Sequence, residues 1–356
     1  MDEKRSSAAL PQLAKTRKEI SGFRSREAGR VRALMTVLVT GAAGFIGYHV
    51  CQALLARGEV VLGFDNLNHY YDPALKQARL AGLRTGNRFE FAEGSVADRV
   101  RVQQLVEQHP DITGIIHLAA QAGVRYSLVN PYAYVEANVM GHLVMLEIAR
   151  HLPGLRHMVY ASSSSVYGDN TKIPFAVGDP VDHPRSLYAA TKRADELMSD
   201  TYARLFGLRL SGLRFFTVYG PWGRPDMAPY IFCRAIFAGE TIPIYNLGFA
   251  RRDFSYVDDI ARGVLACYDR PAAEPGHRLY NFGAHRSEEL MRFVALLERA
   301  AGRKARIELK PAQPGDMTET YADIELTTRD LGWTPATTID EGIPRFVHWF
   351  RQYHGC

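Results

Sequence analysis

A tyrosine and a lysine four residues apart are the clearest candidates for chemistry in this sequence of 356 residues. Tyr188 and Lys192 share one face of a predicted helix, because side chains at positions i and i+4 lie one above the other. A free tyrosine has a pKa of about 10 and is a poor base at neutral pH, but a neighbouring ammonium group stabilises its phenolate. The pair could therefore remove a proton from a substrate hydroxyl.

A run of four hydroxyl side chains precedes this pair. Ser162, Ser163, Ser164 and Ser165 follow an apolar stretch at 157–161 that predicts a strand. Hydroxyls at the carboxyl end of a strand can hold the reacting oxygen and pass a hydrogen bond to Tyr188. Alone, a serine run usually marks a turn and a Tyr-x-x-x-Lys pair usually lies on a helix surface. The two features indicate catalysis only together, in this order, on one suitable fold.

A glycine turn near the start of the chain indicates what that fold binds. The stretch TVLVT at 36–40 runs directly into Gly41, Gly44 and Gly47. A strand, a tight turn and a helix start then follow in the order of a dinucleotide site. Glycines allow the backbone to approach a pyrophosphate, and the helix N-terminus offers it free N–H groups and a positive dipole end.

An acidic residue ends the next predicted strand, at 60–65. Asp65 stands 24 positions after Gly41, where a carboxylate can accept hydrogen bonds from the adenosine ribose and repel a 2′-phosphate. The next residue is Asn66 rather than an arginine. The sequence therefore favours NAD over NADP as the cofactor, and its nicotinamide ring would add positive charge beside Tyr188.

Apolar β-rich runs alternate with amphipathic segments through the first two thirds of the chain. The runs lie at 36–40, 60–65, 114–118, 157–161 and 208–213, and the clearest predicted helices at 45–57, 132–151 and 187–206. Buried strands separated by helices indicate βαβ units, a parallel sheet and right-handed crossovers. We therefore predict an α/β fold with a doubly wound parallel sheet of the Rossmann type.

The pattern becomes irregular after about residue 220, where Pro and Gly are frequent. Short strands and helices are predicted at 252–257, 259–269, 279–282 and 288–300. We predict an NAD-binding domain at 35–215 and a smaller α/β domain at 216–356 that mainly binds substrate at the carboxyl edge of the sheet, with the chain able to cross back to that sheet.

Bulk composition narrows the class of protein. The net charge of +5 belongs entirely to residues 1–34, which hold nine Lys/Arg and four Asp/Glu. This stretch has no apolar signal region, so we predict a leader or tail and no nucleic-acid-binding face. The sequence has no apolar run of 18 or more residues, so no membrane span is predicted. The four scattered cysteines suggest neither a metal site nor disulfides and favour the cytoplasm.

The motifs together resemble the extended short-chain dehydrogenase/reductase family, from about Thr36 to the C-terminus. Four stretches are similar to those of nucleotide-sugar 4-epimerases, and of UDP-glucuronate 4-epimerases in particular. They are FDNLNHYYDPALK at 64–76, HLAAQAGVRYS at 117–127, HPRSLYAATK at 183–192 and RFFTVYGPWGRPDMA at 214–228. One departure is Ser95, because the family often places an aspartate there to meet the adenine.

The resemblance implies a role for each matched residue. Ser163, Tyr188 and Lys192 match catalytic residues, and Lys192 would also bridge the nicotinamide ribose. The NAD contacts implied are Gly41, Gly44, Phe45, Ile46, Gly47, Asp65, Asn66, Ser95, Val96, Leu118, Ala119, Ala120, Tyr188 and Lys192. The UDP-sugar contacts implied are Ser163, Ser164, Ser165, Arg125, Thr217, Arg224, Tyr245, Arg252 and Asp316.

Three of these substrate residues have more specific roles by the same resemblance. Arg252 matches an arginine that binds the diphosphate, and Asp316 a residue near the uridine ribose. Arg224 matches the residue that holds a sugar carboxylate, which a guanidinium can bind through two hydrogen bonds. Without the resemblance, an arginine that caps loop carbonyls is the simpler interpretation of Arg224.

The implied reaction is 4-epimerisation of UDP-glucuronate through a transient 4-keto sugar, with NAD regenerated in every cycle. Epimerisation of UDP-glucose and UDP-galactose is one alternative, and decarboxylation of UDP-glucuronate is another, since a 4-keto uronate is a β-keto acid. A 4,6-dehydratase usually has an Asp-Glu pair where Ser164 and Ser165 stand. A regulator that binds NAD without chemistry would not need Tyr188 and Lys192.

The predicted helices at 132–151 and 187–206 carry substantial apolar faces (Leu143, Leu146, Ile148; Leu197, Tyr202, Leu205). In the family that they resemble, the equivalent helices pair across a two-fold axis as a four-helix bundle. A homodimer is therefore predicted, although the same faces could pack on the sheet of their own chain.

Overall fold

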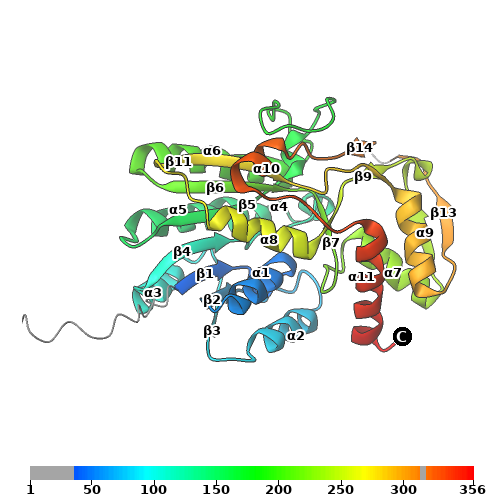
Figure 1. Ribbon diagram of the computed structural model, residues 1–356, viewed down its shortest axis with the longest axis horizontal. Helices are drawn as coiled ribbons and strands as arrows, with labels where there is room; N and C mark the ends of the chain where they lie inside the picture. The colour runs from blue at the N-terminus through cyan, green and yellow to red at the C-terminus, as the bar shows by residue number, and fades with distance from the viewer. Residues whose placement is uncertain (1–35, 313–317) are drawn as a thin grey trace, which may run out of the picture. The chain divides into compact units, whose positions relative to one another are not determined.

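The computed structural model describes residues 36–312 and 318–356. Its main element is a seven-stranded parallel sheet in the order β11-β6-β5-β4-β1-β2-β3 (Figure 1). The strands are β1 (Thr36–Thr40), β2 (Val60–Asp65), β3 (Phe89–Glu93), β4 (Ile112–His117), β5 (His157–Ser163), β6 (Arg209–Phe215) and β11 (Gly276–Phe282). The predicted doubly wound α/β fold is confirmed.

The central strands β1, β4 and β5 are buried along almost their whole length, so both faces of the sheet must be covered. Helices cover both faces. One face packs against α1 (Phe45–Ala56) and α8 (Val257–Tyr268), which contact each other (Figure 1). The other packs against α3 (Arg99–Gln108), α5 (Gly141–His151) and α6 (Leu187–Phe206). The helix α2 (Pro73–Leu83) contacts α1.

The direction of winding reverses between β1 and β4, which are neighbours in the sheet but not in the chain. Ligands of open parallel sheets bind outside the carboxyl ends of the strands at such a switch point. The glycine turn that follows β1 and the segment that follows β4 both begin at this crevice, so the fold brings them together.

A second apolar core unites elements from the later part of the chain. Its helices α7 (Ala228–Ala238), α9 (Leu290–Ala301) and α11 (Ile339–His354) lie side by side (Figure 1). The accompanying strands form small sheets: β7 (Thr217–Tyr219) with β10 (Phe254–Tyr256), β8 (Thr241–Ile244) with β13 (Arg306–Leu309), and β9 (Arg251–Arg252) with β12 (Glu288–Glu289) and β14 (Glu319–Thr320). The short α10 (Glu325–Leu331) contacts β11 in the main sheet.

The structure also corrects the predicted helix at 132–151, which is not one regular helix. It consists of α4 (Pro131–Tyr134), a π-helical segment (Val135–Met140) and α5. The wide segment carries the buried Asn138, whose amide donates to the carbonyl of Gln121 (3.1 Å) and accepts from its N–H (2.8 Å). Such widened turns often serve functional sites, and this one fixes a backbone segment that lines the cavity described next.

Candidate active site

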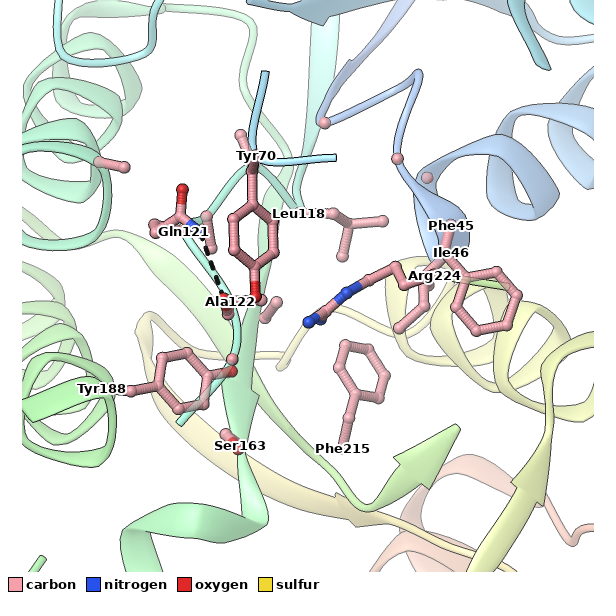
Figure 2. A pocket seen from close by; sticks show the side chains of 18 of the residues that line it. Phe45, Ile46, Tyr70, Leu118, Gln121, Ala122, Ser163, Tyr188, Phe215 and Arg224 are labelled. Carbon is pink, nitrogen blue, oxygen red and sulfur yellow. Dashed lines mark hydrogen bonds between the residues drawn. The ribbon is translucent and has the colours of Figure 1, made fainter. Parts of the chain in front are cut away.

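A cavity of about 450 Å³ opens at the carboxyl ends of the strands around the switch point. Figure 2 shows Tyr188 and Ser163 on one side of it and Arg224 reaching in from the other. Its lining includes all the predicted NAD contacts and the substrate candidates Ser163, Ser164, Ser165, Thr217 and Arg224. The fold therefore gathers residues that are nearly 200 positions apart in the sequence.

The glycine turn forms the cofactor side of this cavity, and its three glycines have no room for a side chain. Gly41 has φ +71°, and a Cβ there would lie 2.8 Å from the backbone nitrogen of Ala119. A Cβ on Gly47 would lie only 2.0 Å from the carbonyl oxygen of Gly41. The helix α1 starts directly after Gly44 and presents its first N–H groups at this turn, as a pyrophosphate requires.

Asp65 lies at the end of β2, where the ribose of a dinucleotide is expected. Its carboxylate is 8% exposed and accepts hydrogen bonds from the backbone of Ala43 (3.2 Å) and Leu67 (2.9 Å). The buried ammonium of Lys76 lies 4.0 Å from it and donates to Asn68 (2.8 Å). Backbone contacts thus fix the orientation of the acid that would read the ribose hydroxyls.

Tyr188 and Lys192 both line the cavity from the first two turns of α6. The helix begins there because Ser186 caps it, accepting a hydrogen bond from the backbone N–H of Ala189 (3.1 Å). The half-buried ring of Tyr188 packs edge-on against Tyr134, with ring centres 6.0 Å apart. Lys192 Nζ donates to the carbonyl of Ala161 (3.0 Å), which ties the helix to the carboxyl end of β5.

All four residues of the serine run line the cavity, and Ser162 also takes part in a buried hydrogen-bond network. Ser162 Oγ donates to Glu196 (2.7 Å), which also accepts two hydrogen bonds from the buried Arg214 (2.8 and 2.9 Å). Burial would raise the pKa of Glu196, but the hydrogen bonds and charge of Arg214 outweigh it and lower that pKa. Ser163 Oγ accepts from the N–H of Ser165 (3.2 Å) and faces the cavity near Tyr188 (Figure 2).

Arg224 brings positive charge to the far side of the cavity. Its Nε donates to Asp226 Oδ1 (3.0 Å), and a second nitrogen contacts the other carboxylate oxygen. Tyr70 also donates to Asp226 (3.0 Å). Burial opposes the charge on Arg224, but Asp226 more than compensates and raises the arginine's pKa. The guanidinium is therefore held as a cation with its tip in the cavity (Figure 2).

Arg79 is fully buried and connects the glycine turn with the loop that carries Arg224. Its guanidinium donates to the carbonyl of Ala43 in the glycine turn (2.9 Å) and to that of Trp222 (2.6 Å), two residues before Arg224. Trp222 has φ +61°, a backbone conformation that costs free energy in a residue other than glycine. Arg79 thus holds the strained loop that carries Arg224 against the loop that would hold the cofactor.

Three predicted substrate contacts among the described residues, Arg125, Tyr245 and Arg252, do not line this cavity. Arg125 is exposed and stacks on the ring of Tyr245, with 5.2 Å from its guanidinium to the ring centre. Arg252 donates to the carbonyls of Arg251 (2.8 Å) and Thr318 (3.2 Å). Asp316 lies outside the described residues.

Sequence reasoning missed several lining residues, notably Tyr70, Lys76, Gln121, Phe215 and Asp226. All five fall within the stretches at 64–76, 117–127 and 214–228 that carried the family resemblance. The sequence Arg224-Pro225-Asp226 offered one direct signal for Asp226, since an arginine two residues from an acid often pairs with it. Among residues 36–312 and 318–356 there is no cluster of His, Cys, Asp and Glu that could hold a metal ion, and no helix long and apolar enough to cross a membrane.

Comparison with known proteins identifies the family. A family model described as NAD dependent epimerase/dehydratase matches residues 37–283. The chain belongs to this family. UDP-glucuronate 4-epimerase 4 of Arabidopsis thaliana is 44% identical over 349 residues, which cover 93% of this chain and 79% of the plant protein. The predictions of the family and of NAD as cofactor are confirmed.

Solved structures agree with this assignment. UDP-glucuronic acid 4-epimerase from Bacillus cereus, in complex with UDP-glucuronic acid and NAD, has a TM-score of 0.82 and 31% identity, covering 90% of this chain and all of that one. UDP-glucose 4-epimerase from Thermotoga maritima, with UDP-glucose, has a TM-score of 0.80 and 30% identity over the same shares. The fold is thus common to epimerases of acidic and of neutral sugars, so the side chains of the site must decide the substrate.

The cofactor side of the cavity fits NAD on physical grounds. The turn at 41–47 excludes Cβ atoms where a pyrophosphate would approach, and the helix behind it offers N–H groups. Asp65 suits free ribose hydroxyls and disfavours a 2′-phosphate. Tyr188 lies across the same cavity from Phe45 and Ile46 (Figure 2), and Lys192 also lines it, so the nicotinamide would meet the sugar there.

Proposed function

We propose that this protein catalyses the NAD-dependent 4-epimerisation of UDP-glucuronate to UDP-galacturonate. The observation that carries the proposal is Arg224, a fixed cation whose guanidinium shares the cavity of Tyr188 and Ser163 (Figure 2). A guanidinium can bind the C6 carboxylate of a uronate in a bidentate fashion. The 44% identity to a UDP-glucuronate 4-epimerase supports the same substrate.

The chain's own residues would place the sugar and move its 4-OH proton. When bound, NAD would supply a hydride acceptor for C4 and then a hydride donor for the other face of the 4-keto sugar. Tyr188 would remove the hydroxyl proton in the first half of the reaction and return it in the second. Ser163 would hold the C4 oxygen through a hydrogen bond, and Lys192 would stabilise the tyrosine phenolate.

The carboxylate of the substrate requires a firm hold, since a 4-keto uronate loses CO₂ when the breaking bond aligns with the ketone. The Arg224 guanidinium is braced by Asp226, which is itself braced by Tyr70. A braced cation fixes the direction of the carboxylate better than a mobile one. We propose that this rigidity keeps the carboxylate out of the alignment for decarboxylation.

The substrate side would draw on the later part of the chain. Thr217, Arg224 and Asp226 in the cavity come from beyond residue 215, which agrees with a division into an NAD-binding part at 35–215 and a mainly UDP-sugar-binding part at 216–356. Arg125, Tyr245, Arg252 and Asp316 remain candidates for the diphosphate and uridine. For residues 1–34, a leader or tail remains the hypothesis.

Epimerisation of UDP-glucose is the second candidate, favoured by the similarity to the Thermotoga maritima enzyme. One assay separates the candidates. Purified protein is incubated with UDP-glucuronate without added NAD, and the products are analysed by chromatography and mass spectrometry. A new isomer of unchanged mass is expected. Loss of CO₂ would mean decarboxylation. If no reaction occurs even with NAD added, UDP-glucose is tested next as the substrate.

We also propose a homodimer. Leu146 is buried in the chain's own core, but Leu197 and Leu205 of α6 are exposed, as are Leu128 and Tyr132, the last two by more than 80%. Apolar side chains exposed on helices are typical of an interface with a second copy. Light scattering at micromolar concentration should give twice the monomer mass of 39.8 kDa. Leu205→Glu should shift the mass toward the monomer, whereas a monomer mass for the unmodified protein would refute the proposal.

The four cysteines are free thiols in the structure, three of them buried. Free thiols persist in a reducing compartment. We therefore keep the cytoplasm as the proposed location.

A further inference from the structure

A line of polar side chains runs along α6 on the face turned toward the sheet. Tyr188, Lys192, Asp195 and Ser199 follow one another at spacings of four, three and four residues, so they share one helix face. The last three are buried, at 3% exposure or less. Buried positions on a helix that covers a sheet are normally apolar, and charged side chains there need a specific reason.

Asp195 is directly paired with the catalytic lysine. Its Oδ2 accepts a hydrogen bond from Lys192 Nζ at 3.1 Å, and both side chains are almost completely buried. The other oxygen, Oδ1, has no hydrogen-bond donor among the described residues. The carboxylate is therefore held almost entirely by the charge of the lysine, and its own negative charge acts mainly on that lysine.

Other titratable groups surround Lys192 and Asp195, on α6 itself and on the strands and the helix packed near it. Each of the following groups is either paired with another charge or uncharged near neutral pH. On α6 itself, Glu196 is engaged by Arg214 of β6. Burial lowers the pKa of His117 of β4 to about 3 and that of His277 of β11 to about 4, and it lowers the pKa of His142 of α5 well below its ordinary value.

Tyr160 of β5 is neutral for the same reason, since burial raises the pKa of its phenol. These histidines and this tyrosine are uncharged near neutral pH. Asp195 is therefore the carboxylate that is left to balance Lys192.

We propose that Asp195 is the counter-ion and positioning residue of Lys192, and that it limits how strongly the lysine promotes ionisation of Tyr188. It would hold Nζ from the side opposite the cavity and offset part of its positive charge. This inference rests on the proposed role of Tyr188 as the proton carrier. A residue that must both take and return a proton in one cycle works best when neither form is strongly favoured.

The electrostatic environment of Asp195 agrees with this role. Burial raises the pKa of Asp195 to about 6, although Lys192 opposes the rise. Above that pH the carboxylate is charged and offsets the lysine, and below it the offset disappears. Lys192 would then act on Tyr188 with its full charge.

The decisive variant is Asp195→Asn, which keeps the shape and an oxygen that can accept from Lys192 but removes the charge. Tyr188 and Asp195 are seven residues apart on one helix, roughly 10 Å along its axis. A unit charge removed at that distance should move the ionisation midpoint of Tyr188 down by about one pH unit. Asp200→Asn is the matched control, since Asp200 lies on the same helix but is 42% exposed and pairs with Arg204 in solvent.

The midpoint is measured on the NAD-loaded protein by titrating the ultraviolet absorbance of phenolate, with the Tyr188→Phe protein as the baseline. We expect a downward shift in Asp195→Asn and none in Asp200→Asn, together with a matching shift of the acid limb in the pH profile of epimerisation. A midpoint for Asp195→Asn that equals the wild-type value, or lies above it, would overturn the inference.

The two measurements keep this inference apart from the proposed function. A shift in the phenolate midpoint of a protein that does not turn over UDP-glucuronate would retain the counter-ion and reject the substrate. Turnover of UDP-glucuronate without any shift would retain the substrate and reject the counter-ion.

Discussion

The two walls of the cavity are built from different materials. The cofactor wall consists mainly of backbone, with Gly41 and Gly47 packed so closely against other main-chain atoms that no Cβ fits. A second wall depends on a long charged side chain, Arg224, held by Asp226. The first wall requires the absence of side chains at its glycines, and the second requires the guanidinium group of Arg224. Substitutions in the first wall should therefore disturb its shape and the binding of NAD. Substitutions in the second wall should change its charge and the preference for one sugar over another.

The largest effect is expected at Tyr188, the proposed proton carrier, which lies across the cavity from Arg224 (Figure 2). Tyr188→Phe removes one hydroxyl and should leave both walls intact, so epimerisation should fall by roughly 10²–10⁴-fold. Bound NAD, measured after denaturing the purified protein, should remain at the wild-type amount. Full activity in this variant would show that Tyr188 is not the base.

Breaking the backbone wall should have the next largest effect. In Gly47→Ala the new Cβ would lie 2.0 Å from the carbonyl of Gly41, so the turn must move. We expect a loss of about 1–3 kcal/mol in the free energy of unfolding and a protein that is purified with little NAD. Gly86→Ala is the matched control, because nothing lies within 4 Å of a Cβ there. Equal NAD content in the two variants would contradict a backbone-defined wall.

The charged wall should respond selectively. Arg224→Ala should lower the kcat/KM for UDP-glucuronate by about 10–100-fold, since a charge-assisted bidentate contact contributes about 1.5–3 kcal/mol. Turnover of UDP-glucose by the same variant should change much less, because that sugar has no carboxylate. Arg224→Lys should recover part of the loss. Equal losses for both sugars would make Arg224 a merely structural arginine.

The smallest effect concerns a partly buried histidine of the main sheet, His277 of β11. Burial lowers the pKa of His277 to about 4, against about 6.5 in an unfolded chain. The unfolded state therefore binds the extra proton first, and the free energy of unfolding should fall as the pH drops from 6.5 to 4. For His277 alone this loss reaches up to about 2 kcal/mol at pH 5.

Urea unfolding at pH 7 and pH 5 measures this dependence. His277→Gln can still bond Tyr160 but does not titrate, so its stability should change less between the two pH values than that of the wild type. A substitution of the exposed His151 should leave the wild-type dependence unchanged. The same slope for His277→Gln and the wild type would reject a neutral His277 in the folded protein.

The sequence predicted the backbone wall well because its constraints are local. The strand Thr36–Thr40, the glycines that follow it and Asp65 occupy the predicted places. Helix α6 runs from Leu187 to Phe206 as predicted, since its cap and apolar spacing are written in adjacent residues. Here local pattern and tertiary structure agree, so the motif and its context could be recognised together.

The charged wall was less predictable because it depends on contacts between distant residues. Nothing near Arg224 in the sequence shows that Asp226 is also held by Tyr70, 156 positions away. The π-helical segment around Asn138 looked like regular helix, because its apolar spacing differs little from that of an α-helix. The role of Asp195 was also invisible, since an acid three residues after a lysine is usually a solvated surface pair.

Arg79 gives the molecule a property that neither wall has alone. One guanidinium bonds both the loop beside the cofactor and the loop that carries Arg224, so a ligand that settles one loop also settles the other. The affinities for NAD and for nucleotide sugar should then be cooperative, and reciprocity requires that each ligand strengthen the other by the same factor. The cofactor would therefore be retained most firmly while an oxidised sugar is present. Loss of the cofactor at that point would leave the reaction half complete.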